Sequence, residues 1–355
     1  MQSVVIGKNQ AGQRLDKFLH KFLPEAGSGF LYKMLRKKNI TLNGKKAEGR
    51  EILALEDMVC FFFSDETFEK FSGRKVSRQE SAERRNVGKP VPTLQGITVL
   101  YEDDDFLFIN KPAGILTQKA VPEDYSLNEW ICGYLLKQDS AFEEELTAFH
   151  PSVCNRLDRN TSGIVLCGKS LRGLQYLSGC IRDRRVRKFY RTICVGCFKE
   201  KTELRGYLAK DTYRNVVKLT SFPENGPGNN IEKSVEAGAQ VRAVCTPLAV
   251  GKKFTLLEVE LVTGKSHQIR AQLAGAGHPL IGDFKYGNDE VNQEFKRKYG
   301  LSHQLLHACR VEFPKAEPEN PQRAAQVFRG ESLSGKTVSA PLPALFDRLQ
   351  ADLFS

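Results

Sequence analysis

Apolar residues near the amino terminus recur at helical spacing and predict two short helices. The first presents one apolar face, made of Leu15, Phe18, Leu19, Phe22 and Leu23. Ser28 is a suitable cap for the second helix, which turns Leu31, Met34 and Leu35 inward and leaves its basic residues on the outer face, at Lys33, Arg36, Lys37 and Lys38. The run 40–42 then predicts a short strand, and Asn43-Gly44 is typical of a tight hairpin turn before Lys45 and Lys46. These residues predict a compact module with one basic edge that can contact phosphates.

Beyond residue 72 the pattern changes. Residues 73–95 are polar, charged and poor in apolar side chains, which predicts a flexible linker. From Gly96 onward, short apolar runs predict many strands with few helices between them, at 97–100, 106–109, 164–167 and 254–262. This order favours an α+β fold over alternating βαβ units. We therefore predict a basic module at 1–72, a linker at 73–95 and a larger domain at 96–355.

The most informative segment is Asn155-Arg156-Leu157-Asp158-Arg159-Asn160-Thr161-Ser162-Gly163. It places the Asp158 carboxylate between two guanidiniums, directly before a turn and a buried strand. Catalytic groups often lie on loops that rigid strands hold in place. The flanking Arg residues would favour the ionised carboxylate and attract a polyanion. For this pattern alone, an Asp that only forms a structural salt bridge in the turn is the alternative.

The net charge of +11 and the pI of about 9.1 favour a polyanionic partner. The charge is clustered, since residues 1–50 carry eleven Lys and Arg against three acids and residues 182–191 carry six against one. Clustering argues against a basic surface that is merely solvated. No apolar run approaches the ~18 residues needed to cross a bilayer, and residues 1–8 lack a signal-peptide core. We therefore expect a cytoplasmic protein without a membrane anchor.

The nine cysteines are scattered and mostly lie in apolar segments, as reduced thiols do. Cys194 and Cys197 have the spacing of a redox or zinc pair, but no second pair and no suitably spaced His accompanies them. We therefore expect no metal. The chain has neither a P-loop nor a dinucleotide-binding glycine motif, so we expect no other cofactor.

Two further segments carry candidate chemistry. In Arg187-Lys188-Phe189-Tyr190-Arg191 an aromatic ring lies among cations, which suits a flipped base stacked on the ring with phosphates near the charges. Packing of Tyr190 in the core as an ordinary strand residue is an equal alternative. The segment Thr263-Gly264-Lys265-Ser266-His267-Gln268-Ile269-Arg270 predicts a turn and a helix start, where backbone N–H groups bind anions. His267 is then an acid–base group or, more often at such a position, a structural hydrogen-bond donor.

These segments resemble motifs of the RluA-type pseudouridine synthases, which isomerise uridine in RNA. The family signature H-R-L-D-x-x-T-S-G is matched with Asn155 in place of His, and Tyr190 occupies the Tyr of a K-x-Y element. Residues 263–270 are similar to T-G-R-T-H-Q-I-R, with Lys265 and Ser266 as departures. Segments 101–114, 277–287 and 305–308 also resemble family motifs, so the resemblance spans nearly the whole chain in the expected order.

The resemblance implies a pseudouridine synthase domain built on a mixed, mostly antiparallel sheet with a central RNA-binding cleft. It implies that Asp158 is the catalytic carboxylate, that Arg270 pairs with it, and that Tyr190 stacks on the base and assists proton transfer. We expect further substrate contacts at four positions. Arg156 is a candidate to fill the space that the flipped base leaves, Leu306 lines the uracil pocket, and Lys188 and His267 lie in the motifs above.

Residues 10–64 resemble a small S4 (αL-type) RNA-binding domain, so Arg36, Lys37 and Lys45 are expected to contact RNA. Gly27-Ser28-Gly29 stands where that family commonly has a basic residue. With this extension the chain is most similar to RluC/RluD-type members. That resemblance implies uridines of large-subunit (23S) ribosomal RNA as the substrate, and we expect the chain to act as a monomer.

The expected reaction breaks the N1–C1′ bond of uridine, turns the uracil and rejoins it through C5. One carboxylate suits this isomerisation, because hydrolysis of a glycosidic bond typically uses two acids. Asp158 either attacks C1′ and holds the sugar covalently, or removes the C2′ proton to give a glycal. Two other functions stay open at this point. They are a catalytically silent RNA-binding or ribosome-assembly factor and a carboxylate-dependent glycosidase.

Overall fold

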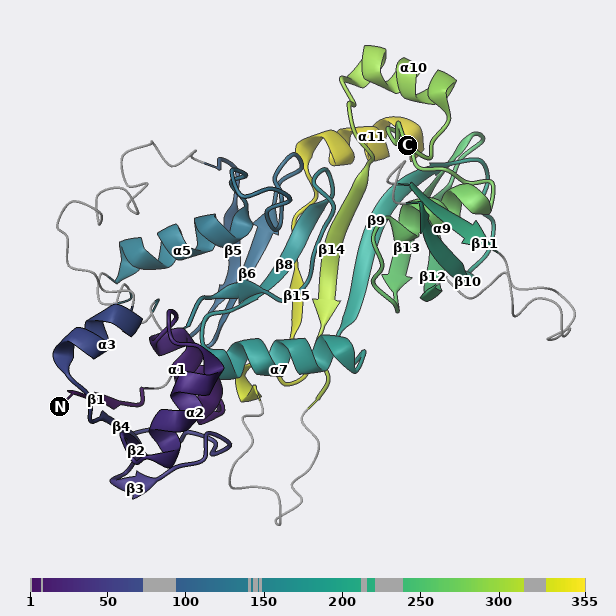
Figure 1. Cartoon of the computed structure of the whole chain (residues 1–355). Helices are drawn as coiled ribbons and strands as arrows, with labels where there is room; N and C mark the ends of the chain where they lie inside the picture. The colour runs from purple at the N-terminus through teal and green to yellow at the C-terminus, as the bar shows by residue number, and fades with distance from the viewer. Residues whose placement is uncertain are drawn as a thin grey trace, which may run out of the picture.

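The structure is a computed structural model that describes residues 2–7, 9–72, 94–139, 142, 146, 149–211, 216–220, 239–315 and 330–354. All but the last two residues of the linker expected at 73–95 lie outside these ranges. The described chain forms two sheets, each with its own apolar core (Figure 1). None of its helices is long and apolar enough to cross a membrane.

The amino-terminal module has a four-stranded sheet in the order β1-β4-β2-β3. Its elements are β1 (Gln2–Val5), α1 (Leu15–Phe22), α2 (Ser28–Arg36), β2 (Ile40–Leu42), β3 (Lys45–Lys46), β4 (Met58–Phe61) and α3 (Asp65–Ser72). The two predicted helices and the hairpin are confirmed. Asn43 and Gly44 have φ of 51° and 71°, as a two-residue turn between twisted strands requires. The expected Ser28 cap is wrong, because α2 starts one residue early and Gly27 precedes its first turn.

The larger domain has an eleven-stranded sheet that is antiparallel except where β8 pairs with β14, which confirms the expected mixed, mostly antiparallel sheet. The strand order is β11-β10-β12-β13-β9-β14-β8-β6-β5, with β15 on β14 and β7 on β8. The strands are β5 (Thr98–Glu102), β6 (Phe106–Lys111), β7 (Ser152–Val153), β8 (Ser162–Gly168), β9 (Arg187–Val195), β10 (Thr202–Asp211), β11 (Val216–Thr220), β12 (Ala239–Val250), β13 (Phe254–Leu261), β14 (Leu306–Glu312) and β15 (Thr337–Ser339).

Helices cover both faces of this sheet (Figure 1). They are α5 (Leu127–Gln138), α7 (Leu171–Arg182), α9 (Gln268–Gly275), α10 (Asp289–Tyr299) and α11 (Ala344–Phe354). Side chains of β6 alternate between two cores, as strand geometry requires. Phe106 and Phe108 pack in the core that includes α7, whereas Leu107 and Ile109 pack in the core that includes α5. The centre of the sheet is therefore packed against apolar side chains on both faces.

Strand β14 lies between β8 and β9 and brings distant segments of the chain together. His307 pairs with Ser162 at the start of β8, and Ala308 pairs with Tyr190 of β9. The loop that carries Asp158 ends where β8 begins. Asp158, Tyr190 and the start of β14 therefore meet at one point of the sheet, although they lie far apart in sequence.

Gly163 marks the closest approach of β8 to β14. Its φ is +109°, and a Cβ built there collides with the backbone of Ala308. We expect Gly163→Ala to force the strands apart and to lower the free energy of unfolding by on the order of 3 kcal/mol. Urea unfolding followed by circular dichroism measures this change.

Gly133→Ala is the matched control, because Gly133 lies inside α5 and a Cβ there meets nothing within 4 Å. That variant should gain up to ~1 kcal/mol from helix propensity. Equal unfolding free energies of the two variants would contradict the tight crossing at Gly163.

Candidate active site

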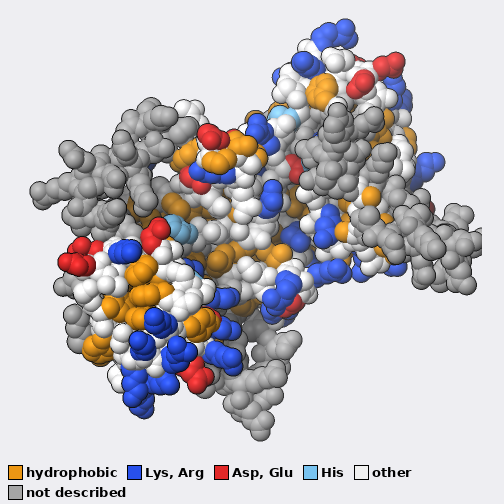
Figure 2. Space-filling model, in the orientation of Figure 1, with side chains coloured by type: hydrophobic (Ala, Val, Ile, Leu, Met, Phe, Trp, Pro, Cys, Tyr) orange, Lys and Arg blue, Asp and Glu red, His pale blue; other side chains and the backbone are white. Residues whose placement is uncertain are grey.

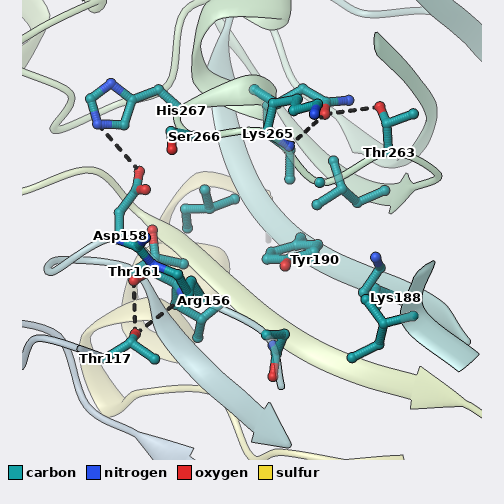
Figure 3. Close-up of a pocket in the computed structure, with 18 of the residues that line it drawn as sticks. Thr117, Arg156, Asp158, Thr161, Lys188, Tyr190, Thr263, Lys265, Ser266 and His267 are labelled. Carbon is teal, nitrogen blue, oxygen red and sulfur yellow. Dashed lines mark hydrogen bonds and ion pairs between the residues drawn. The ribbon is translucent and has the colours of Figure 1, made fainter. Parts of the chain in front are cut away.

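A cleft of about 840 Å³ opens beside the Asp158 loop (Figure 3). Its walls are the Asp158 loop, β9, the turn that follows β13, the first turn of α9 and the first residue of β14. Among the described residues that line it, Asp158 is the one acid. Seven lining residues are basic, namely Arg156, Arg159, Arg182, Arg184, Lys188, Lys265 and Arg270. Such a cleft presents a single carboxylate inside a field that favours anions.

The guanidinium of Arg270 joins two carboxylates. Its Nε and Nη2 donate to Oδ2 and Oδ1 of Asp283 at 2.7 and 2.8 Å. Its remaining terminal nitrogen, Nη1, donates to Oδ2 of Asp158 at 3.0 Å. No ion pair between Asp158 and either flanking Arg is recorded in the described chain, so the cation expected to hold the carboxylate comes from α9. This geometry fits the Arg270–Asp158 pair that the sequence predicted.

Asp283 is fully buried, with none of its side chain exposed. Burial would raise the pKa of Asp283, but the hydrogen bonds and charge of Arg270 outweigh burial and hold that pKa below its usual value. The backbone N–H groups of Lys285 and Tyr286 also donate to Asp283, at 3.0 and 3.1 Å. Asp283 is therefore a positioning residue that fixes Arg270, and it does not reach the cleft.

The Asp158 loop is held from the side by residues 111–117. Lys111 is fully buried and donates to the carbonyls of Pro112, Ile115 and Arg159 at 2.9 to 3.0 Å. Burial lowers the pKa of Lys111 to about 7, and the charge of Asp158 opposes that shift. The hydroxyl of Thr117 donates to the carbonyl of Leu157 at 2.8 Å and accepts from its N–H at 3.2 Å. Both residues that flank Asp158 are thus fixed through their backbone.

Asn155 fixes the other end of the loop. The backbone ladder between β7 and β8 continues to the N–H of Cys154, which donates to the carbonyl of Leu166. The Asn155 side chain then accepts from the N–H of Leu166 at 2.7 Å and donates to the carbonyl of Ile164 at 3.2 Å. A carboxamide has both a donor and an acceptor. The Asn155 side chain therefore continues the hydrogen bonding to β8 beyond the last backbone pair. Asn155 therefore ties the start of the Asp158 loop to β8.

The turn before α9 is tied by Gln268. Its Oε1 accepts from the hydroxyl of Thr263 at 2.9 Å and from the N–H of Lys265 at 3.1 Å. His267 caps the helix in the left-handed region, with φ of 56°. Its Nδ1 lies 2.9 Å from the hydroxyl of Tyr286, and its Nε2 lies 4.0 Å from Oδ2 of Asp158. Burial lowers the pKa of His267, while the charge of Asp158 opposes that shift, so the neutral imidazole is favoured.

Tyr190 and Leu306 are core residues that also line the cleft. The alternative that Tyr190 packs in the core of β9 is therefore met, and stacking of its ring on a base stays a prediction. Burial, aided by the charge of Asp158, raises the pKa of Tyr190 well above its usual value, so its hydroxyl stays protonated at neutral pH. In Figure 3 the Tyr190 ring lies between Asp158 on one side and Lys188 on the other.

The cleft brings together seven of the ten residues predicted to act: Asp158, Tyr190, Arg270, Arg156, Leu306, Lys188 and His267. The other three, Arg36, Lys37 and Lys45, are exposed on the amino-terminal module. Arg36 lines a smaller hollow there with Lys33 and Lys46.

Sequence reasoning gave no role to Asp283, Lys111 or Thr117. A Lys at the end of an apolar strand run was a usable signal for Lys111, because such a residue needs buried acceptors. No comparable local signal marks Asp283, whose role depends on a contact with α9.

The Cys194–Cys197 pair does not form a site. Cys194 is buried in β9, whereas Cys197 is exposed and its thiol contacts the carbonyls of Gly251 and Lys252. In the described ranges, no group of three His, Cys, Asp or Glu residues is placed to hold a metal ion.

The fold is that of a pseudouridylate synthase. The structure of the human RNA pseudouridylate synthase domain containing 4 superposes with a TM-score of 0.52 at 17% sequence identity. The match covers 71% of this chain and 91% of that one.

The sequence comparisons name the family. The profile of the RNA pseudouridylate synthase family matches residues 105–275, which include Asp158, Tyr190 and Arg270. A ribosomal large subunit pseudouridine synthase C from Vibrio vulnificus is 28% identical over 90% of this chain and 91% of its own length. An uncharacterized RNA pseudouridine synthase from Mycoplasma pneumoniae is 28% identical over 89% of both chains. The chain matches the RNA pseudouridylate synthase family over residues 105–275, and its similarity to proteins named as RNA pseudouridine synthases extends over about nine tenths of its length.

The Asp283–Arg270 pair generates a prediction about positioning. Asp283→Asn removes the charge that compensates the buried guanidinium while keeping the size of the side chain. We expect the free energy of unfolding to fall by on the order of 3 kcal/mol and pseudouridine formation to fall more than tenfold, because Arg270 loses its fixed orientation. Urea unfolding and initial rates measure the two effects.

Asp289→Asn is the control, because Asp289 is exposed in the first turn of α10. It should change stability by no more than about 0.5 kcal/mol. If Asp283→Asn behaves like this control in both measurements, Asp283 does not position Arg270.

Asn155 gives a second prediction. Asn155→Leu removes both hydrogen bonds to β8, so we expect kcat to fall at least tenfold while KM changes less, since the cleft walls stay in place. Asn155→His restores a donor and an acceptor on a ring and should recover most of the lost rate. Steady-state kinetics of the three proteins provide the measurement. A His variant as slow as the Leu variant would show that the carboxamide does not act by holding the loop.

Proposed function

We propose that this protein isomerises uridine to pseudouridine in large-subunit ribosomal RNA. One observation carries the proposal. A single carboxylate, Asp158, faces a cleft lined by seven basic residues and is oriented by the buried guanidinium of Arg270. The named relatives that act on the ribosomal large subunit support the substrate, because the similarity covers about nine tenths of both chains.

The chemistry follows from what the cleft offers. The N1–C1′ bond of uridine breaks, the detached uracil turns, and a C5–C1′ bond forms. The proton that leaves C5 passes to solvent, and N1 gains a proton in exchange. Atoms and oxidation state are conserved, so the reaction requires no redox partner. Either route for Asp158, attack on C1′ or removal of the C2′ proton, starts from the carboxylate. The hydrogen bond from Arg270 at 3.0 Å fixes the direction in which the carboxylate points.

The neighbouring side chains suit a flipped uridine. The Tyr190 ring offers a stacking face, and its protonated hydroxyl is available for proton transfer to or from the base. Leu306 supplies an apolar wall that helps to retain the detached uracil and to exclude water. Arg156 is exposed beside Asp158, where its guanidinium can take the space that the base leaves in the RNA.

We also infer that the amino-terminal module is an S4-type RNA-binding domain that adds affinity and site choice. Figure 2 shows Lys and Arg side chains gathered on the side of the module that carries α2 and β3. The exposed cations there are Lys33, Arg36, Lys37, Lys38, Lys45 and Lys46. A basic edge of this kind holds phosphates through charge and not through base sequence.

Two other functions fit the site less well. A glycosidase typically uses two carboxyl groups about 5 to 10 Å apart across the scissile bond, and Asp158 has no second acid among the described residues of the cleft. A silent RNA-binding factor has no use for a carboxylate aimed by a buried Arg. Formation of pseudouridine discriminates between all three functions.

Asp158→Asn tests the proposal directly. It keeps the shape of the side chain but removes the nucleophile or base, so product should fall below detection while RNA affinity stays within about threefold. The assay measures tritium released from ribosomal RNA labelled at C5 of uridine, followed by mapping of pseudouridine.

Asp347→Asn, an exposed position on α11, is the control and should turn over normally. Undiminished tritium release by Asp158→Asn would remove Asp158 from the chemistry. No release by the wild-type protein on large-subunit RNA would remove the proposed activity on that substrate.

A further inference from the structure

The segment between α7 and β9 carries a run of cations that are not equivalent. Arg182 and Arg185 both pair with Asp183, at 2.9 and 3.9 Å. Arg187 pairs with Glu260 and Glu312, each at 2.8 Å. Neither Arg184 nor Lys188 forms an ion pair with any described residue, and both line the cleft.

Lys188 is unusual because it is buried and has no counter-charge among the described residues. Only 9% of the residue is exposed, and its ammonium lies 3.8 Å from where a Cβ of Gly264 would stand. Burial lowers the pKa of Lys188, and the nearby charge of Arg184 lowers it further. A buried ammonium without a carboxylate is unfavourable unless an anion from outside the chain neutralises it.

Arg184 lines the same cleft as Lys188. Its backbone adopts the left-handed region, with φ of 56°, which ordinary side chains avoid. In this turn Asp183 forms ion pairs with Arg182 and Arg185. Arg184 instead lines the cleft with Lys188. A planar guanidinium and a compact ammonium that line the same part of a cleft can bind a phosphate group together.

The position of Lys188 relative to the reacting groups indicates where along the cleft a phosphate would bind. Lys188 and Tyr190 lie two residues apart on β9, so their side chains leave the sheet on the same side, about 7 Å apart. Figure 3 shows Lys188 beyond the Tyr190 ring as seen from Asp158. An RNA strand that crosses the cleft past a uridine stacked on Tyr190 therefore comes within reach of Lys188.

We propose that Arg184 and Lys188 form a subsite for an RNA backbone phosphate next to the reacting nucleotide. This inference rests on the proposed function for the identity of the anion as RNA. The subsite is distinct from the Asp158–Arg270 pair, because Arg270 is already neutralised by two carboxylates.

Salt-dependent binding of a 15-nucleotide oligouridylate, read by fluorescence anisotropy, tests the subsite without requiring turnover. The variants are Lys188→Met, Arg184→Met and both together. The double variant should lower the slope of log affinity against log salt by about 0.7 to 1.4, the value for one or two phosphate contacts of a single strand. Arg185→Met is the matched control from the same turn, since Arg185 is paired and lies outside the described cleft lining; its slope should stay close to that of the wild type.

A second readout separates this role from a structural one. Lys188→Met keeps the aliphatic stem and removes an unpaired buried charge, so thermal unfolding should occur at the same or a higher temperature while RNA affinity falls about three- to tenfold. A stability loss with an unchanged salt slope would assign Lys188 to the fold and overturn the subsite.

The outcomes also distinguish the subsite from the activity. Slopes of the Arg184 and Lys188 variants that match Arg185→Met, in a wild-type protein that makes pseudouridine, would overturn the subsite alone. A reduced slope in the double variant, in a protein that makes no pseudouridine, would support the subsite and overturn the activity.

Discussion

The buried guanidinium of Arg270 is the interaction on which the arrangement of the site depends. A guanidinium without partners in this environment would be strongly unfavourable, and two carboxylates share it. Asp283 takes two nitrogens in a bidentate pair and leaves one for Asp158. The direction of that last N–H fixes where the reactive carboxylate lies. Elements far from the chemistry thereby contribute to it, because Asn292 of α10 donates to the carbonyl of Asp283 at 2.9 Å.

The same pairing restricts the reaction. Asp283 is an acid close to the cleft, but it forms an ion pair with Arg270 and its side chain is fully buried. Among the described residues of the cleft, one half-buried carboxylate therefore faces a substrate that the surrounding basic residues attract. Hydrolysis by paired acids is disfavoured, and an isomerisation that needs a single carboxylate and a dry pocket is favoured. The basic residues of the cleft favour a polyanionic substrate. The single carboxylate favours an isomerisation.

Local patterns in the sequence predicted what depends on local structure. The structure has the predicted elements in the predicted places. They include the helix within residues 15–23, the turn at Asn43-Gly44 and the strand that contains residues 164–167. Local patterns do not predict contacts between segments that are distant in sequence. Lys111 meets the carbonyl of Arg159 across 48 positions, and Arg270 meets Asp158 across 112. The second was predicted only because the motif resembled a known family, which carries tertiary information that spacing and charge do not.

Unpaired charge in the cleft also bears on what the protein is for. Lys188 is buried with no counter-ion in the part of the chain that the structure describes, and Arg184 adopts a strained backbone beside it, so both lower the stability of the free protein. A sheet covered on both faces can offset such a cost, because most of its apolar side chains are fully buried. Selection for stability alone would favour replacing Lys188 by an apolar residue that fits the same space. An anionic ligand would offset this cost, and RNA is the polyanion that the proposed uridine-modifying cleft would meet.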